Sequence, residues 1–204
     1  MTVAERGEMP RPFGYVLAGG RSERFGSDKA RAVVQGQPLL IHAVEALRAV
    51  AADVRIVGDR TDRYADLGLP GVADREPHLG PMGGLLAALA DARARAPEGA
   101  WILVSPCDLV GVRQEWLRSL MAGRTREVDA VAFRDAAAVA RRSPWQPLPA
   151  LYHTRLLPAV EAAIARQDRA LWRLLEAGRA RSLPLPADWG ELRVVHTPAD
   201  LPTS

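Results

Sequence analysis

The sequence has little cysteine and no long apolar run. Its one cysteine, Cys107, excludes an internal disulfide and a zinc site built from cysteines. No apolar stretch approaches the roughly 20 residues that a membrane-spanning helix needs. No basic segment followed by an apolar stretch stands at the N-terminus, so we expect no secretory signal. These absences predict a reducing, cytoplasmic setting without a membrane partner.

Neither sign of charge dominates, and lysine is almost missing. The chain has 27 basic and 24 acidic residues, a net charge of +3, and no block of like charge. This balance argues against a nucleic-acid partner. Lys29 is the single lysine, and every other basic residue is arginine. Such a bias is typical of a GC-rich genome, so a remaining lysine indicates a need for a compact point charge, with a chance remainder as the alternative.

The composition is that of an ordinary globular chain. Of 204 residues, 48% are hydrophobic and 25% are charged. Residues 1–12 carry glycine, proline and charges without periodicity, and we expect a flexible N-terminal tail there. Residues 13–204 are then a single domain, with halves at 13–133 and 134–204.

Short apolar runs alternate with segments of helical spacing. We predict strands at 13–17, 54–57, 71–73, 101–104, 128–133 and 192–195. We predict helices at 38–50, 60–67, 85–95, 114–121, 154–167 and 169–177, with an irregular or hairpin region at 134–149. This alternation predicts an α/β fold of three layers, α/β/α, with a mainly parallel sheet. Ligands of such sheets gather at the carboxyl ends of strands, where loops begin at Ala18, Asp74 and Ser105.

A glycine-rich loop follows the first predicted strand. Gly19 and Gly20 allow backbone amides to approach a ligand closely and to form an anion-binding nest. Arg21 and Lys29 bring cations to the same loop, which favours a polyanion such as a triphosphate. The spacing matches neither the Walker P-loop nor the dinucleotide-binding fingerprint. The alternative is a flexible turn with solvated arginines.

Two aspartates follow other predicted strands. Asp108 comes after the most apolar strand, where packing gives no reason for a carboxylate. Magnesium prefers one or two carboxylates together with phosphate oxygens and water, so Asp108 is the candidate metal ligand. Asp74 follows the third strand. The alternative for both residues is a turn or helix-capping aspartate.

The loop from Leu17 to Ala30 resembles the nucleotide-binding signature of molybdenum cofactor guanylyltransferases. The segments from Gly80 to Gly84, from Ser105 to Asp108 and from Gln146 to Tyr152 resemble further family motifs in the expected order. The resemblance implies a Rossmann-like nucleotidyltransferase fold of the GT-A type, with a nucleotide-binding half over 13–133 and an acceptor-side half over 134–204.

The resemblance also implies an activity. The chain would transfer GMP from GTP to Mo-molybdopterin with Mg²⁺ and release pyrophosphate, and cofactor-delivery proteins or molybdoenzymes would be partners. Lys29, Arg21 and Asp108 would be catalytic, with Asp108 holding the metal. The residues implied in nucleotide binding are Leu17, Ala18, Gly19, Gly20, Arg21, Lys29, Asp74 and Asp108. Asp74 would read the guanine edge or orient the loop, and the missing methyl at Gly19 is compatible with a purine.

The chain departs from this family near its C-terminus. Family members commonly carry asparagines where this chain has Val194 and His196, and valine cannot replace an amide. Three alternatives therefore stay open: cytidylyl transfer, transfer to another phosphorylated acceptor, and a non-catalytic GTP-binding factor in cofactor assembly. Cys107 is expected to be a small apolar filler.

Overall fold

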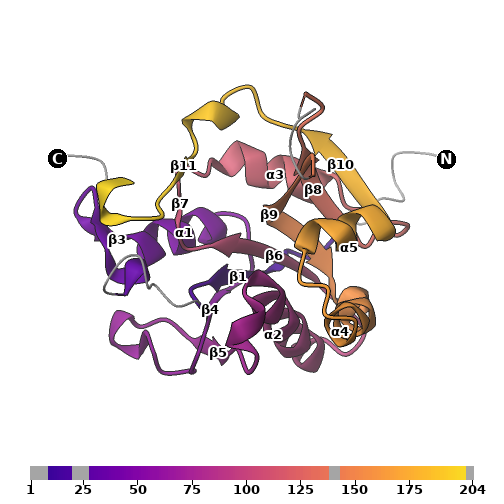
Figure 1. The fold of residues 1–204 in the computed structure, drawn as a ribbon, viewed down its shortest axis with the longest axis horizontal. Helices are drawn as coiled ribbons and strands as arrows, with labels where there is room; N and C mark the ends of the chain where they lie inside the picture. Colours follow the sequence, from indigo (N-terminus) through magenta and orange to yellow (C-terminus); the bar gives the residue numbers. More distant parts are fainter. Residues whose placement is uncertain (1–8, 20–27, 138–142, 201–204) are drawn as a thin grey trace.

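A seven-stranded sheet forms the centre of the computed structural model, which describes residues 9–19, 28–137 and 143–200 (Figure 1). The strand order is β10-β8-β9-β6-β1-β4-β5. The strands are β1 (Phe13–Leu17), β4 (Val54–Gly58), β5 (Gly71–Ala73), β6 (Trp101–Pro106), β8 (Ala130–Arg134), β9 (Trp145–His153) and β10 (Ala180–Pro184). Only β9 runs antiparallel to its neighbours, β6 and β8. The predicted mainly parallel sheet is confirmed.

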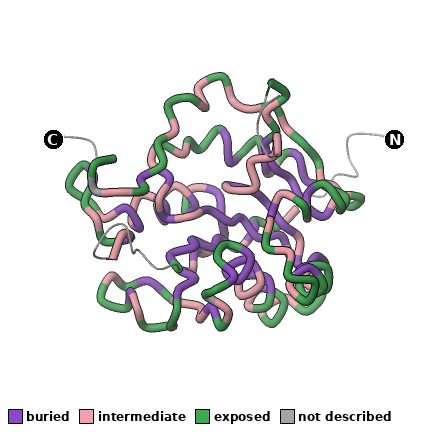
Figure 2. The backbone as a smooth tube through the Cα atoms, viewed as in Figure 1, coloured by how far each residue is buried: buried purple, intermediate pink, exposed green. Residues whose placement is uncertain are grey.

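Helices cover both faces of this sheet, as predicted. One face carries α1 (Leu39–Arg48) and α3 (Gln114–Ala122), and the other carries α2 (Pro81–Arg95), α4 (Leu157–Ala165) and α5 (Leu171–Ala177). Val44 and Leu117 pack with Leu103 in the first buried cluster, and Leu89 packs with Ile102 in the second. Figure 2 shows these buried segments at the centre of the molecule. Among the described helices, none is both long and apolar enough to cross a bilayer.

Strand β6 is apolar from Trp101 to Val104 because the sheet is covered on both faces there. Leu103 points into the cluster below α1 and α3, whereas Ile102 and Val104 point into the cluster below α2. Successive side chains of a strand face opposite sides of the sheet, and both sides are covered here. No position from Trp101 to Ser105 therefore faces water.

Helix α2 begins at Pro81, four residues before the predicted start at Leu85. Proline is favoured at the first helical position, because its missing N–H would be unpaired there and its φ already suits a helix. Gly83 and Gly84, which we predicted to be part of a turn, lie inside the helix. They are glycines because the Glu76 carbonyl at Gly83 and the Leu17 side chain at Gly84 come too close for a side chain at either position.

Several other predicted elements differ from the structure. The predicted helix over 60–67 is only a 3-10 turn, η3 (Ala65–Leu67). The region 134–149 follows the hairpin alternative, since β8 and β9 pair antiparallel within and beyond it. The last strand, predicted over 192–195, is the shorter β11 (Arg193–Val194). It pairs with β7 (Leu109–Val110) in a separate two-stranded sheet. Strand β10 was not predicted, because its mixed Ala-Arg-Ser-Leu-Pro sequence reflects an edge position with one neighbour.

The end of the predicted tail is tied to the helices of one face. The Arg11 side chain donates Nε to the Val50 carbonyl at 3.2 Å, just beyond α1. Arg124, just beyond α3, donates Nη1 to the Pro10 carbonyl at 2.7 Å. Arg11 also donates Nη2 to the carbonyl of Arg48, the last residue of α1, at 3.4 Å. The last carbonyls of a helix have no partner within the helix, so this contact stabilises the helix end. Pro10 and Arg11 are therefore hydrogen-bonded to the domain, while residues 1–8 of the predicted tail lie outside the described residues, and a flexible tail stays a prediction there.

Asp129 connects three strands at the far end of the sheet. Its carboxylate accepts hydrogen bonds from Arg179, with Nε at 2.9 Å from Oδ2, and from Arg155. Arg179 precedes β10, Asp129 precedes β8, and Arg155 follows β9. The His153 amide also donates to the Asp129 carbonyl at 2.8 Å. The side chain of Asp129 is only 13% exposed, so the carboxylate is largely shielded from water although the Arg179 side chain is exposed.

We expect Asp129→Asn to lower the free energy of unfolding by about 2 kcal/mol, because the variant leaves two arginines without their counter-charge. Urea denaturation measures this loss. Asp66→Asn is the matched control, since Asp66 also pairs with an arginine, Arg31 at 2.7 Å, but its side chain is 57% exposed. An exposed pair contributes less than about 1 kcal/mol. Equal losses in the two variants would contradict the role assigned to Asp129.

Candidate active site

The carboxyl ends of the parallel strands β1, β4, β5 and β6 lie along one edge of the sheet. Ala18 follows β1, Asp74 follows β5 and Asp108 follows β6. The amide of Cys107 donates to the carbonyl of Leu17 at 3.0 Å, which joins the ends of β6 and β1. The structure therefore brings the predicted loops to the edge where ligands of such sheets bind.

Lys29 and Asp108 meet at this edge. Lys29 begins the 3-10 helix η2 (Lys29–Arg31), and Asp108 lies in the turn between β6 and β7. The Lys29 Nζ lies 2.8 Å from Asp108 Oδ2, although the two residues are 79 positions apart in the sequence. Their side chains are 16% and 23% exposed, so the pair is partly shielded and still open to a solute. The cation predicted to bind phosphates and the carboxylate predicted to bind a metal thus lie in contact.

Gly19 and Asp74 form a second pair nearby. A Cβ atom placed at Gly19 would lie 3.9 Å from Asp74 Oδ2 and 4.0 Å from the Val57 carbonyl oxygen. The Gly19 backbone is exposed, while the Asp74 residue is buried. A ligand over Gly19 therefore approaches the Asp74 carboxylate directly.

Asp74 also has a structural role. Its Oδ1 accepts a hydrogen bond from the Glu76 amide at 2.8 Å. A Cβ at Gly83 would lie 3.0 Å and 3.1 Å from the two carboxylate oxygens, so a glycine in the first turn of α2 lets Asp74 pack against that helix. The N-terminus of a helix stabilises a carboxylate, whereas burial raises the pKa of Asp74. Asp74 therefore serves as a turn residue and still lies beside Gly19.

Of the other predicted nucleotide-binding residues, the structure describes Leu17 and Ala18 but not Gly20 and Arg21. Leu17 and Ala18 are buried at the end of β1, so they can offer a ligand only their backbone. Gly20 and Arg21 lie outside the described residues, and their predicted roles stay predictions.

Two further residues, Asp28 and Tyr64, lie around the start of η2 and were not predicted as site residues. Asp28 caps η2, since its Oδ1 accepts a hydrogen bond from the Ala30 amide at 3.1 Å. The Tyr64 hydroxyl lies 3.2 Å from each oxygen of Asp28. The position of Asp28 directly before the single lysine was a usable signal. Tyr64 stands in no motif, so only the folded chain reveals it.

The C-terminal segment reaches the same edge of the sheet. Val194 pairs with Leu109 in the two-stranded sheet of β11 and β7 (Figure 1), and the Val195 amide donates to the Asp108 carbonyl at 3.0 Å. The Val194 residue is 42% exposed. The amide of His196 donates to Asp200 Oδ2 at 2.8 Å. The two residues that depart from the family pattern thus flank the residue that holds the Asp108 backbone.

Cys107 lies next to Asp108 but is not a nucleophile. The residue is buried, and burial raises the pKa of its thiol to about 12. A thiol with that pKa stays protonated at neutral pH, and the thiolate is the reactive form. The expectation of an apolar filler is confirmed.

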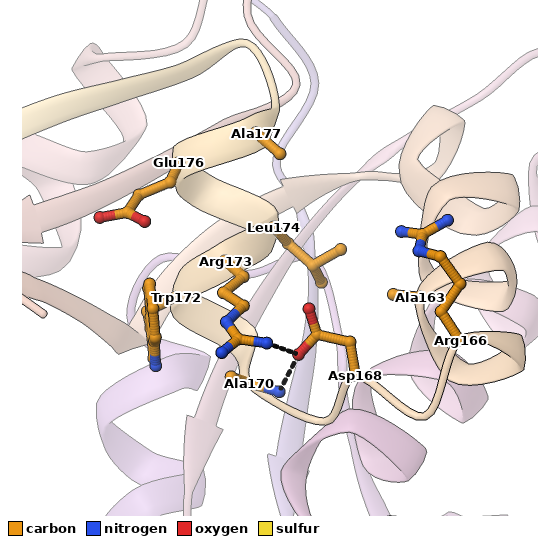
Figure 3. Close-up of a pocket in the computed structure, with 9 residues that line it drawn as sticks. All are labelled: Ala163, Arg166, Asp168, Ala170, Trp172, Arg173, Leu174, Glu176 and Ala177. Atoms are coloured by element: carbon orange, nitrogen blue, oxygen red, sulfur yellow. Dashed lines mark hydrogen bonds and ion pairs between the residues drawn. The ribbon is translucent and has the colours of Figure 1, made fainter. Parts of the chain in front are cut away.

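A separate pocket of about 400 Å³ lies between α4 and α5 (Figure 3). Arg166, Asp168, Trp172 and Arg173 are among its lining residues. The Asp168 carboxylate accepts hydrogen bonds from the Ala170 amide and pairs with Arg173, each at 3.2 Å. One arginine of the pocket therefore already has a counter-charge. Lys29 and Asp108 do not line this pocket.

Comparison with known proteins identifies relatives of this chain. Residues 14–183 match the MobA-like NTP transferase domain. The chain is 35% identical over 165 residues to the molybdenum cofactor guanylyltransferase of Pseudomonas putida, which covers 78% of this chain and 80% of that protein.

Solved structures share the fold at lower identity. The molybdopterin-guanine dinucleotide biosynthesis protein A of Archaeoglobus fulgidus superposes with a TM-score of 0.71 at 21% identity, over 92% of this chain and 94% of that one. CMP:2-keto-3-deoxy-manno-octonic acid synthetase, solved with CTP, gives a TM-score of 0.67 at 15% identity, over 94% and 95%. The expected nucleotidyltransferase-like fold is therefore confirmed.

Proposed function

Because this chain belongs to the family of MobA-like NTP transferase domains, we propose that it transfers GMP from GTP to the terminal phosphate of Mo-molybdopterin. In this reaction an oxygen of the acceptor phosphate forms a bond to the α-phosphorus of GTP. The bond from that phosphorus to the bridging oxygen breaks, and pyrophosphate leaves with the electron pair. The name of the Pseudomonas putida relative supports the nucleotide and the acceptor.

The observation that carries the proposal is the contact between Lys29 and Asp108. Nucleotidyl transfer increases the negative charge around the α-phosphorus, so positioning and neutralisation of charge supply most of the catalysis. The ammonium of Lys29, 2.8 Å from the carboxylate, is close enough to contact the phosphates of any nucleotide whose metal Asp108 holds. A compact ammonium and a carboxylate at one edge suit a nucleoside triphosphate with its divalent ion.

The residues present fit a magnesium ion. Asp108 offers an oxygen ligand on a partly exposed side chain, and magnesium prefers few carboxylates with phosphate oxygens and water. Among the described residues, no three His, Cys, Asp or Glu side chains gather as a preformed metal centre. When bound, Mg²⁺ would neutralise phosphate charge. The chain's own task is to present the Asp108 carboxylate to the metal and the Lys29 ammonium to the phosphates at the same edge.

The proposal is tested by pyrophosphate formation from GTP and Mo-molybdopterin. We expect pyrophosphate in a one-to-one ratio with the guanylylated product, and GTP to exceed CTP, ATP and UTP as donor. A chain that binds GTP but forms no pyrophosphate with that acceptor would contradict GMP transfer.

We expect Gly19→Ala to shift the ratio of kcat/KM for CTP over GTP about tenfold toward CTP, because the added methyl narrows the space beside Asp74. The new Cβ would lie 3.9 Å from Asp74 Oδ2, an ordinary contact, so the variant should fold normally. Parallel assays with GTP and CTP measure the shift. Gly190→Ala is the control, since nothing lies within 4 Å of its new Cβ. An unchanged ratio in Gly19→Ala would remove this residue from base selection.

A different phosphorylated acceptor is the second candidate. Val194 favours it, because an exposed valine stands beside the strand that leads from Asp108 and offers an acceptor no hydrogen bond. Pyrophosphate formed with another phosphorylated acceptor, and not with Mo-molybdopterin, would support this candidate.

A further inference from the structure

The hydroxyl of Tyr64 lies where the two ends of the glycine-rich segment converge. It is 3.2 Å from both carboxylate oxygens of Asp28 and 3.5 Å from the carbonyl oxygen of Ala18. Ala18 ends the strand that leads into the segment, and Asp28 lies directly before Lys29. One hydroxyl therefore faces both sides of the candidate phosphate-binding site.

Tyr64 itself is held firmly. The residue is 2% exposed and packs in the core cluster that also contains Ala18 and Ala30. A buried ring cannot swing away from Asp28 without opening this core. Burial and the Asp28 charge raise the pKa of the Tyr64 hydroxyl, so the group stays protonated and donates. The charged carboxylate is a stronger acceptor than the more distant carbonyl.

Asp28 links the Tyr64 hydroxyl to Lys29, because its carboxylate contacts Tyr64 and also caps the 3-10 helix that begins at Lys29. Its Oδ1 caps η2 through the Ala30 amide, and Lys29 is the first residue of that helix. Arg63 donates Nε and Nη2 to Asp28 Oδ2, each at 3.2 Å, and is itself held by Asp59 at 2.9 Å. The orientation of the Asp28 carboxylate, and with it the start of η2, thus depends on Tyr64 and Arg63.

We propose that Tyr64 is a positioning residue for the nucleotide: its hydroxyl holds Asp28, and through Asp28 it holds the Lys29 ammonium at a set distance from the end of β1. The inference rests on the proposed function, because it assigns Lys29 to the phosphates. Tyr64 touches no substrate and acts only through its neighbours. Since Arg63 also holds Asp28, removal of the hydroxyl weakens the site and does not abolish it.

Tyr64→Phe is the direct test, with the dissociation constant of GTP measured by calorimetry without acceptor. We expect binding about tenfold weaker than that of the wild type. Tyr15→Phe is the matched control, because it also removes a buried tyrosine hydroxyl from a carboxylate, Asp91 Oδ2 at 2.6 Å, toward the carboxyl end of α2. We expect Tyr15→Phe to bind GTP within twofold of the wild type while losing comparable resistance to urea.

Repeating the Tyr64→Phe substitution in a chain that lacks Lys29 distinguishes a positioning role of Tyr64 from general destabilisation of the fold. In a Lys29→Met chain, Tyr64→Phe should weaken GTP binding by less than twofold further, because the ammonium that Tyr64 positions is gone. Asp28→Asn, which retains an oxygen to cap η2, should weaken binding as Tyr64→Phe does. Equal effects of Tyr64→Phe with and without Lys29, or tight binding by Tyr64→Phe itself, would overturn the inference.

The readout also separates this inference from the proposed transfer. If the wild-type chain binds GTP and Tyr64→Phe weakens that binding, but no pyrophosphate is formed, only GMP transfer fails. If the wild-type chain binds no GTP, both fail.

Discussion

We expect Lys29→Arg to lower kcat/KM for GTP by about 100-fold, which corresponds to about 2.7 kcal/mol of transition-state stabilisation. The site surrounds a compact ammonium whose side chain is 16% exposed and whose nitrogen lies 2.8 Å from Asp108 Oδ2. A guanidinium is planar, larger and spread over several donors, so it cannot take the same position between the carboxylate and a phosphate. Steady-state rates of pyrophosphate formation at varied GTP concentrations measure the loss.

Lys29→Arg keeps the positive charge, so it tests the shape of the cation separately from its charge, which Lys29→Met cannot do. Lys29→Met should lose at least as much activity, because it removes both the charge and the shape. Arg60→Lys is the control, since it makes the reverse change in an exposed ion pair with Asp62. We expect it to stay within twofold of the wild type. Wild-type activity in Lys29→Arg would mean that the single lysine is an accident of composition.

Asp108→Asn is expected to have two opposite effects. Pyrophosphate formation with Mg²⁺ falls by about 1000-fold, because a neutral amide is a poor magnesium ligand. Binding of GTP in the presence of EDTA, in contrast, becomes about tenfold tighter, because the Asp108 charge no longer competes with phosphates for Lys29. Calorimetry with EDTA and rate measurements with Mg²⁺ detect the two effects separately.

The opposite signs follow from the ion pair itself. Without a divalent ion, a triphosphate must displace a carboxylate that lies 2.8 Å from the ammonium, and the two anions repel each other. Asp66→Asn is the control, because Asp66 pairs with Arg31 of the same 3-10 helix. It should leave both measurements unchanged. Weaker GTP binding by Asp108→Asn in EDTA would show that Lys29 and Asp108 do not compete in this way.

The layered fold and several residues of the candidate site could be predicted from local features of the sequence. The apolar run of β6 predicted a strand buried on both faces, and alternation with helical segments predicted the layers. Parallel strands place their carboxyl ends together, so the loop after β1 and Asp108 could be assigned to one edge without coordinates. The solitary Lys29 stood out by composition alone, because its chemistry differs from that of arginine.

Contacts between side chains that are distant in the sequence could not be predicted in this way. The 2.8 Å contact of Lys29 with Asp108 and the hold of Tyr64 on Asp28 join positions 79 and 36 residues apart. Folding also places Gly83 inside a helix, where the Glu76 carbonyl oxygen would lie 2.4 Å from a Cβ atom and excludes a side chain. The local spacing of apolar residues predicts which face of a helix or strand is buried. It does not predict which residue of another element packs against that face. That choice depends on the packing of the whole core, because a side chain's partners are fixed only when distant elements fill the same space.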